Sequence, residues 1–270
     1  MKINRGLAGL AALTAATLTL TGCGSSDDSD DATTPGATAS PAAAPADRLL
    51  DSVPDEEAPA YAFAAAGACA VPISGVIDAP GKTIRTTITQ KIPEVGGSVT
   101  MTFLAIGTDK PYVKIALKPA SLASRMGVPK GWTTVDPKKI TDFDESPFSY
   151  NGETDPLGIA ALVEAASDVT EAGGKFTGTV DLTEATEVEA LAEEKTVAAL
   201  GDKAKAVPFE AVVDATSGSV TSMKVQLPAA GKVKGGSCTL TYEGQGSTKT
   251  PAAPKTARKT PATVYDMLNA

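Results

Sequence analysis

Histidine is absent from the sequence, and this absence bears directly on function. Histidine is the commonest general base and the commonest metal ligand, and Ser-His-Asp and Cys-His catalytic sets depend on it. The ordinary forms of both catalytic sets are therefore excluded. We expect a protein that is not an enzyme and that holds neither a metal nor another cofactor.

Large aromatic side chains and positive charge are also scarce. Aromatic residues make up 4% of the chain, with one tryptophan, and 24 Lys and Arg stand against 32 Asp and Glu, for a net charge of −8. A core of small side chains can form in 270 residues, but it is short of large groups to fill it. An acidic chain is also a poor partner for nucleic acid.

The chain begins with an apolar run that is too short to span a membrane. Lys2 and Arg5 precede an uncharged stretch, residues 6–20, which is followed by two small residues. A transmembrane helix needs about 20 apolar residues, whereas this layout is typical of a secretory signal peptide. We therefore predict that residues 1–22 are a signal peptide.

The end of this segment, Leu20-Thr21-Gly22-Cys23, resembles the bacterial lipobox. The resemblance implies cleavage before Cys23 and a diacylglycerol thioether on its sulfur. Each buried methylene contributes about 0.8 kcal/mol, so two acyl chains anchor a protein without a spanning helix. This predicts an extracytoplasmic protein anchored to the outer face of the cell membrane. The alternative is an ordinary secreted protein with an incidental cysteine.

Composition separates a folded region from two flanking segments. Residues 23–59 have low hydrophobicity, several prolines and nine acidic residues against one arginine, which predicts a disordered acidic tether with a short helix at 47–53. Residues 247–270 are rich in proline, threonine and lysine and are expected to be disordered, apart from local folding at the end. The domain between them is 60–246.

Apolar and polar residues alternate with a period of two through much of this domain. Such alternation is typical of strands that bury one face of an antiparallel sheet. The clearest hairpin is 208–227, where two alternating runs flank a Thr-Ser-Gly-Ser turn. The pattern predicts nine or ten strands, of which the best defined lie in 71–78, 83–92, 98–107, 111–118, 175–181, 208–227 and 236–243.

Two or three helices interrupt the strands. Residues 155–169 begin with Asp155 as N-cap and a proline at the first helical position. Apolar residues cover most of this helix, so we expect it to be buried against the concave face of the sheet. Residues 186–204 predict a more amphipathic helix, or a pair, that ends at Gly201, and 119–127 a third, short helix.

Cys69 and Cys238 remain after Cys23 is assigned to the membrane. Two cysteines outside the cytoplasm favour a disulfide, and both alternate with inward-facing positions of predicted strands near the two ends of the domain. The alternative is a pair of unpaired buried cysteines that act as small hydrophobic residues.

Two other motifs resemble a phosphate-binding loop and a calcium-binding loop, but neither has the residues that such a loop needs. The stretch GVIDAPGKT, 75–83, lacks a P-loop glycine at the required position and precedes a strand, so a turn at Pro80-Gly81 is favoured. Asp142, Asp144 and Glu145 are too few, at the wrong spacing, for a calcium loop, and we interpret them as a solvated acidic loop.

Five segments, taken in order, resemble the actinobacterial LppX/LprA/LprF/LprG lipoproteins, a family similar in architecture to the LolA lipoprotein carrier. The resemblance implies an α+β fold: a strongly curved, unclosed antiparallel half-barrel of about 9–11 strands, with two or three helices on its concave face. The segments are FLAIGTDKPYVKIAL (103–117), GWTTVDPKKI (131–140), DPLGIAALVEAASDVTEAGG (155–174), KFTGTVDL (175–182) and VPFEAVVDATSGSVTSMKVQLP (207–228).

The same resemblance implies an apolar cavity for the acyl chains of glycolipids or phospholipids. We therefore expect a monomeric lipoprotein that carries or presents a lipid at the cell envelope, with an envelope transporter or acceptor protein as a further partner. The alternative is an envelope protein-interaction or stress-sensing module of the same fold, with a filled core and no lipid ligand. The residues expected to line the cavity are Met101, Phe103, Val113, Ile115, Leu157, Ile159, Leu162, Val163 and Phe209.

Overall fold

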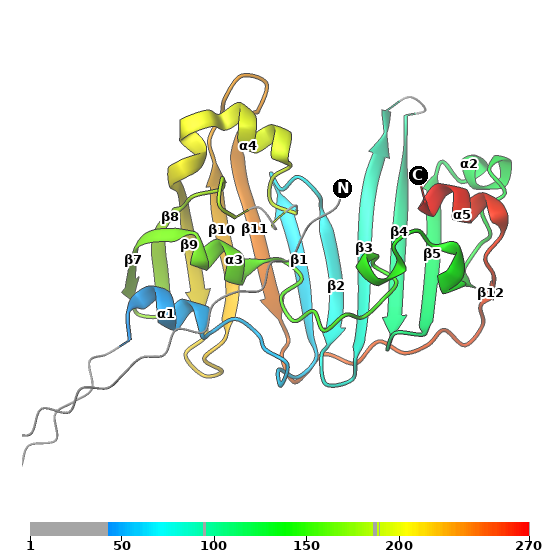
Figure 1. Cartoon of the computed structure of the whole chain (residues 1–270), viewed down its shortest axis with the longest axis horizontal. Coiled ribbons are helices and arrows are strands. Elements are labelled where there is room, and N and C mark those ends of the chain that lie inside the picture. Colours follow the sequence, from blue (N-terminus) through cyan, green and yellow to red (C-terminus); the bar gives the residue numbers. More distant parts are fainter. Residues whose placement is uncertain (1–42, 94–95, 186–187, 189, 270) are drawn as a thin grey trace, which may run out of the picture. The chain divides into compact units, whose positions relative to one another are not determined.

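The protein is described by a computed structural model that covers residues 43–93, 96–185, 188 and 190–269. The predicted signal peptide, Cys23 and the first part of the predicted tether lie outside the described residues. Residues Ala42–Ala270 form one compact unit. The described part has an α+β fold, with a large unclosed sheet of 12 strands and five short α-helices (Figure 1).

The sheet has the strand order β12-β6-β5-β4-β3-β2-β1-β11-β10-β9-β8-β7. All neighbours are antiparallel except β6 and β12, which are parallel. Every segment in which alternation predicted a strand contains one, whereas β1, β6, β7 and β12 are not among those segments. The strands are β1 Tyr61–Gly67, β2 Ile73–Asp78, β3 Thr83–Ile92, β4 Gly97–Ile106, β5 Lys110–Lys118, β6 Trp132–Thr134, β7 Ala166–Ala172, β8 Lys175–Val180, β9 Val207–Val213, β10 Val220–Leu227, β11 Gly236–Glu243 and β12 Arg258–Lys259.

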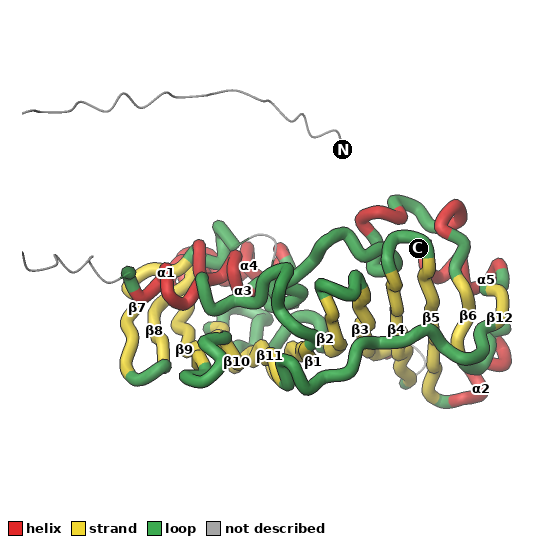
Figure 2. Tube along the Cα trace, turned by 90° about the horizontal axis from the view of Figure 1, so that it is seen from below, coloured by secondary structure: helices red, strands yellow, loops and turns green. Residues whose placement is uncertain are grey.

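The five α-helices each have only six or seven residues. Seen along the strands, α1, α3 and α4 lie on one side of β7–β10 (Figure 2). The helices are α1 Pro45–Leu50, α2 Ala120–Arg125, α3 Ile159–Glu164, α4 Glu194–Leu200 and α5 Ala262–Leu268, and the 3-10 turns are Pro137–Lys139, Phe143–Glu145 and Gly201–Ala206.

Strand register divides the sheet into an apolar face and a polar face, because residues directly opposite each other lie on the same side. On the apolar face, Phe63 of β1 is opposite Gly75 of β2, and Phe103 of β4 is opposite Val113 of β5. A Cβ atom at Gly75 would lie 2.4 Å from Cζ of Phe63, so glycine lets this ring cover the strand. The polar face carries rows of threonine.

The apolar face supports two separate hydrophobic cores. The first core joins β1, β2 and β7–β11 to helices α1, α3 and α4, and the second joins β4 and β5 to α5 and to the segment 128–148. The largest fully buried members of the first core are Tyr61, Tyr242, Leu49, Ile77, Leu157, Ile159, Leu162, Leu191, Met223 and Leu240. The second core contains Val99, Phe103, Val113, Ile115, Leu117, Val128, Val135, Ile140, Phe148, Val264 and Tyr265.

The structure corrects the predicted boundary between the tether and the domain. Residues 45–59 are not a disordered tether, because Leu49 of α1 is fully buried in the first core. The backbone N–H of Val220 donates to the carbonyl of Ser52 at 2.9 Å, and Arg48 pairs with Glu171 of β7. Leu49, with Leu50, Val53 and Ala58 packed beside it, and a few polar contacts therefore add an acidic, proline-containing segment to the fold.

The expected disorder of the tail is corrected for the segment that leads to β12, whereas the local folding expected at its end is confirmed as α5. Within 247–269, helix α5 buries Val264 and Tyr265 in the second core. The hydroxyl of Tyr265 accepts a hydrogen bond from the backbone N–H of Asp136 at 2.7 Å. Proline and threonine, which indicated disorder, instead form an extended connection that leads to β12 and α5.

The predicted helix over 155–169 is wrong over most of its length. Helix α3 begins only at Ile159 because Gly158 has a φ of +67° and interrupts the helical path. Strand β7 begins at Ala166 and pairs with β8 across a turn at Gly173 and Gly174. The predicted helix at 119–127 is confirmed as α2. Of the helix predicted over 186–204, the structure shows α4, which ends just before Gly201 as expected, followed by the 3-10 turn Gly201–Ala206; residues 186–187 and 189 lie outside the described residues.

The predicted disulfide is confirmed, and it joins Cys69 to Cys238. Cys238 lies in β11, but Cys69 follows the end of β1 and is not in a strand. The two strands are neighbours in the middle of the sheet, where Gly67 is opposite Cys238. The disulfide therefore links β11 to the segment that follows its neighbour β1, so the two cysteines lie near opposite ends of the domain sequence but close together at the middle of the sheet.

Candidate functional site

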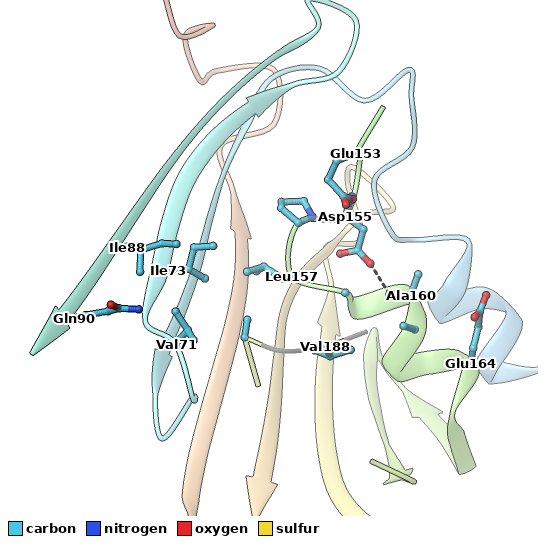
Figure 3. Close-up of a pocket in the computed structure, with 14 residues that line it drawn as sticks. Val71, Ile73, Ile88, Gln90, Glu153, Asp155, Leu157, Ala160, Glu164 and Val188 are labelled. Carbon is cyan, nitrogen blue, oxygen red and sulfur yellow. Dashed lines mark hydrogen bonds between the residues drawn. The ribbon is translucent and has the colours of Figure 1, made fainter. Parts of the chain in front are cut away.

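An open pocket of about 640 Å³ lies on the apolar face, where the two cores meet. Its lining includes Ile73 of β2, which packs against the first core, and Ile88 of β3, which packs against the second. These residues are directly opposite each other in the sheet. Across from them lies the segment 153–161 (Figure 3), and the full lining is Val71, Ile73, Ile88, Gln90, Glu153, Asp155, Pro156, Leu157, Gly158, Ala160, Ala161, Glu164, Val188 and Ala190.

Asp155 holds this segment in place. Its Oδ2 accepts a hydrogen bond from the backbone N–H of Ala160 at 2.6 Å, and its Oδ1 accepts one from the hydroxyl of Tyr242. The same hydroxyl accepts the backbone N–H of Leu157 at 3.2 Å. Because Tyr242 belongs to the central strand β11, these contacts fix the start of α3 relative to the sheet.

A second tyrosine strengthens this attachment. Tyr61 of β1 donates its hydroxyl hydrogen to the carbonyl of Thr154, and its ring packs edge-to-face on that of Tyr242, with 5.1 Å between centroids. Burial raises the pKa of Tyr242 well above its ordinary value, and the nearby Asp155 carboxylate raises it further. The pKa of Tyr61 is raised by the same two causes in the same order. Both hydroxyls therefore remain protonated and able to donate.

Replacing Tyr242 by phenylalanine should lower the free energy of unfolding by about 2 kcal/mol, since it removes a hydrogen bond to a carboxylate and leaves a backbone N–H unpaired. Urea unfolding measures the change. Tyr112→Phe is the matched control, because its hydroxyl makes no hydrogen bond to any described residue. Equal losses for the two variants would contradict the role assigned to Tyr242.

The pocket combines apolar walls with an acidic rim. The walls are aliphatic and include Val71, Leu157 and Val188, whereas carboxylates come from Glu153, Asp155 and Glu164. No lysine or arginine is among the described residues that line it. Such a pocket suits an apolar chain and disfavours an anionic group at this opening.

The structure does not bring the nine predicted cavity residues together. Only Leu157 lines the pocket. Ile159, Leu162, Val163 and Phe209 are packed in the first core, and Phe103, Val113 and Ile115 in the second, while Met101 is half-buried against the second.

Sequence reasoning missed Val71, Ile73, Ile88 and Val188 as lining residues. The alternation that places Ile84, Ile88 and Ile92 on one face of a strand was the available signal for Ile88. It did not indicate which of these residues would lie between two cores. For Val188, which lies within a predicted helix, the sequence held no such signal.

Two further features are absent from the described residues: a metal site and a membrane-spanning helix. Among them, no three Asp, Glu or Cys side chains are grouped so that they could hold a metal ion. In the same part of the chain, no helix is both long enough and apolar enough to cross a membrane.

Comparisons with known proteins provide no relative. No model of a known protein family matches the chain, and no curated protein matches it. The function is therefore inferred from the residues and the pocket.

Proposed function

We propose that the protein is a membrane-anchored extracytoplasmic lipoprotein that binds a lipid acyl chain in the pocket between the two cores. It would carry or present that lipid at the cell envelope. The observation that carries this proposal is the pocket of about 640 Å³ with an aliphatic wall on the apolar face of the sheet. The lipobox-like sequence ending at Cys23 supports the location.

The size and lining of the pocket support a lipid ligand. Pockets that bind small molecules typically have volumes of about 300–1,000 Å³ and are mainly apolar. A chain lying along Ile73, Ile88 and Leu157 would gain about 0.8 kcal/mol for each methylene that it buries. No reacting group is needed for such binding.

The acidic rim favours a lipid with an uncharged, hydroxyl-bearing head group. Glu153 and Glu164 are exposed and can accept hydrogen bonds from sugar or glycerol hydroxyls. A phosphate placed beside the same carboxylates would be repelled. We therefore favour a glycolipid over an anionic phospholipid as the ligand.

The family resemblance supplies the finer architecture of the proposal. The large unclosed sheet is compatible with a strongly curved half-barrel that has helices on its concave face. In the proposal, the acyl chain would lie on that face, against the side of the sheet that carries Ile73 and Ile88. The protein would act as a monomer and exchange lipid with an envelope transporter or acceptor protein.

Filling the pocket tests the proposal. Ala160 is half-buried and lines the pocket, so Ala160→Trp should place an indole where the acyl chain lies. Excluding roughly three methylenes at about 0.8 kcal/mol each should weaken binding on the order of 50-fold. Titration with a fluorescently labelled monopalmitoylglycerol, whose head group is uncharged and bears hydroxyls, measures the affinity.

The matched control is Ala199→Trp, an exposed position on α4 that does not line the pocket. This control should bind the labelled monopalmitoylglycerol as the wild type does. If the wild type takes up no labelled lipid, the proposal is wrong, and the alternative of an envelope interaction module without a lipid ligand is favoured.

A further inference from the structure

Positive charge is concentrated on the polar face of one half of the sheet. Strands β3–β6 and β12 contain no aspartate or glutamate, although the protein has a net charge of −8. Opposite pairs such as Lys118 with Ser98, and Lys114 with Thr102, assign the basic side chains to the polar face. The exposed cations of this basic face are Arg85, Lys91, Lys110, Lys114, Lys118 and Lys259.

The other half of the same sheet has a different charge balance. Strands β7–β11 contain four acidic residues and two lysines. One of these lysines, Lys175, pairs with Glu210 at 2.7 Å on the polar face. None of the six cations of the basic face forms an ion pair with any other described residue. The basic face is therefore a local feature and does not follow from overall composition.

The C-terminal segment extends the basic face along one edge of the sheet. Residues 247–260 contain four cations and no acid, and they pass the ends of β2–β5 before reaching β12 (Figure 1). Thr250 anchors the segment by donating its hydroxyl hydrogen to Asp78, the only acidic residue of β2. This contact fixes the segment beside the end of β2.

The arrangement of these groups indicates the kind of surface that they would bind. Lys110, Lys114 and Lys118 lie at every fourth position of β5, so they extend over about 27 Å along one strand. Threonine rows of the neighbouring strands β3 and β4 lie beside them, as where Thr89 and Thr100 hydroxyls are hydrogen-bonded at 3.0 Å. Such a broad array fits many phosphates in a plane better than it fits a single phosphate.

We propose that the basic face docks the domain onto an anionic phospholipid bilayer. Each lysine or arginine near such a surface increases binding about fivefold, and salt screens the effect. Trp132 begins β6 opposite Lys114 and is half-buried, so its ring can contribute an interfacial contact at the edge of the face. This inference is independent of the pocket and of its ligand, which lie on the apolar face.

Vesicle binding tests the inference. The protein is the full chain with Cys23→Ala, which carries no acyl anchor, and the vesicles contain phosphatidylglycerol and phosphatidylcholine in equal parts. Lys110→Gln, Lys114→Gln and Lys118→Gln together should weaken sedimentation with these vesicles on the order of 100-fold at low salt. Lys114→Gln alone should weaken it about fivefold.

The matched control combines Lys224→Gln, Lys232→Gln and Lys234→Gln, which changes the net charge equally at exposed positions outside the basic face. This control should change binding far less. Equal weakening by the two triple variants, or equal binding to pure phosphatidylcholine vesicles, would overturn the inference. Stronger binding to polyglutamate than to the anionic vesicles would also overturn it, in favour of an acidic protein partner.

Discussion

Replacing Cys69 and Cys238 together by alanine should lower the free energy of unfolding by roughly 5 kcal/mol. The two cysteines are 169 residues apart, so the disulfide closes a loop that includes most of the domain. In the chain-entropy account, the unfolded chain loses more freedom as the closed loop becomes longer. Urea unfolding of the wild type and of the double variant measures the difference.

The position of the disulfide adds an effect on the pocket. Directly after Cys69, the backbone N–H groups of Ala70 and Val71 donate to the carbonyls of Leu191 and Ala190, at 3.1 and 3.2 Å. Val71 and Ala190 both line the pocket. Loss of the disulfide should therefore weaken lipid uptake as well as stability.

A reducing agent provides the control for this prediction. It should destabilise the wild type as much as the double substitution does, and it should leave the double variant unchanged. A loss below about 1 kcal/mol on reduction would contradict the account, because it would mean that the unfolded chain is already restricted without the disulfide.

Leu49→Ala should cost about 3–4 kcal/mol of unfolding free energy, since the leucine of α1 is fully buried and its removal leaves a cavity in the first core. Leu50→Ala is the matched control on the same helix, where the side chain is only half-buried, and it should cost less. Urea unfolding of both variants makes the comparison. Equal small losses would mean that α1 does not contribute to the fold and that the tether extends to residue 59.

The sheet could be predicted well from the sequence because alternation reports directly on burial. Ile84, Ile88 and Ile92 share a face, and the sequence 98–118 shows both strands of a hairpin and the turn between them. The disulfide could be predicted because only two cysteines remained after Cys23 was assigned. The strand predictions depend on the local alternation of apolar and polar residues. This alternation directly determines which side chains of a strand are buried in the folded protein.

The site could not be predicted because it depends on contacts between distant residues. The pocket opening is fixed where Asp155 meets Tyr242, which is 87 positions away, and where the positive φ of Gly158 delays the start of α3. In the sequence, apolar residues would cover most of the surface of a helix over 155–169, which is why a buried helix was the expected structure. The separation of the apolar face into two cores, which places Phe103 and Phe209 in different clusters, has no signal in any local pattern.

Native mass spectrometry of the domain tests the central claim most directly. The protein, with Cys23→Ala to prevent acylation, would be purified from whole cells, where membrane lipids are available to it, and its bound lipid would be extracted. The account predicts a lipid adduct that is present in the wild type and in Ala199→Trp, and lost in Ala160→Trp. A bare protein mass for the wild type, with no uptake of added monopalmitoylglycerol, would contradict it.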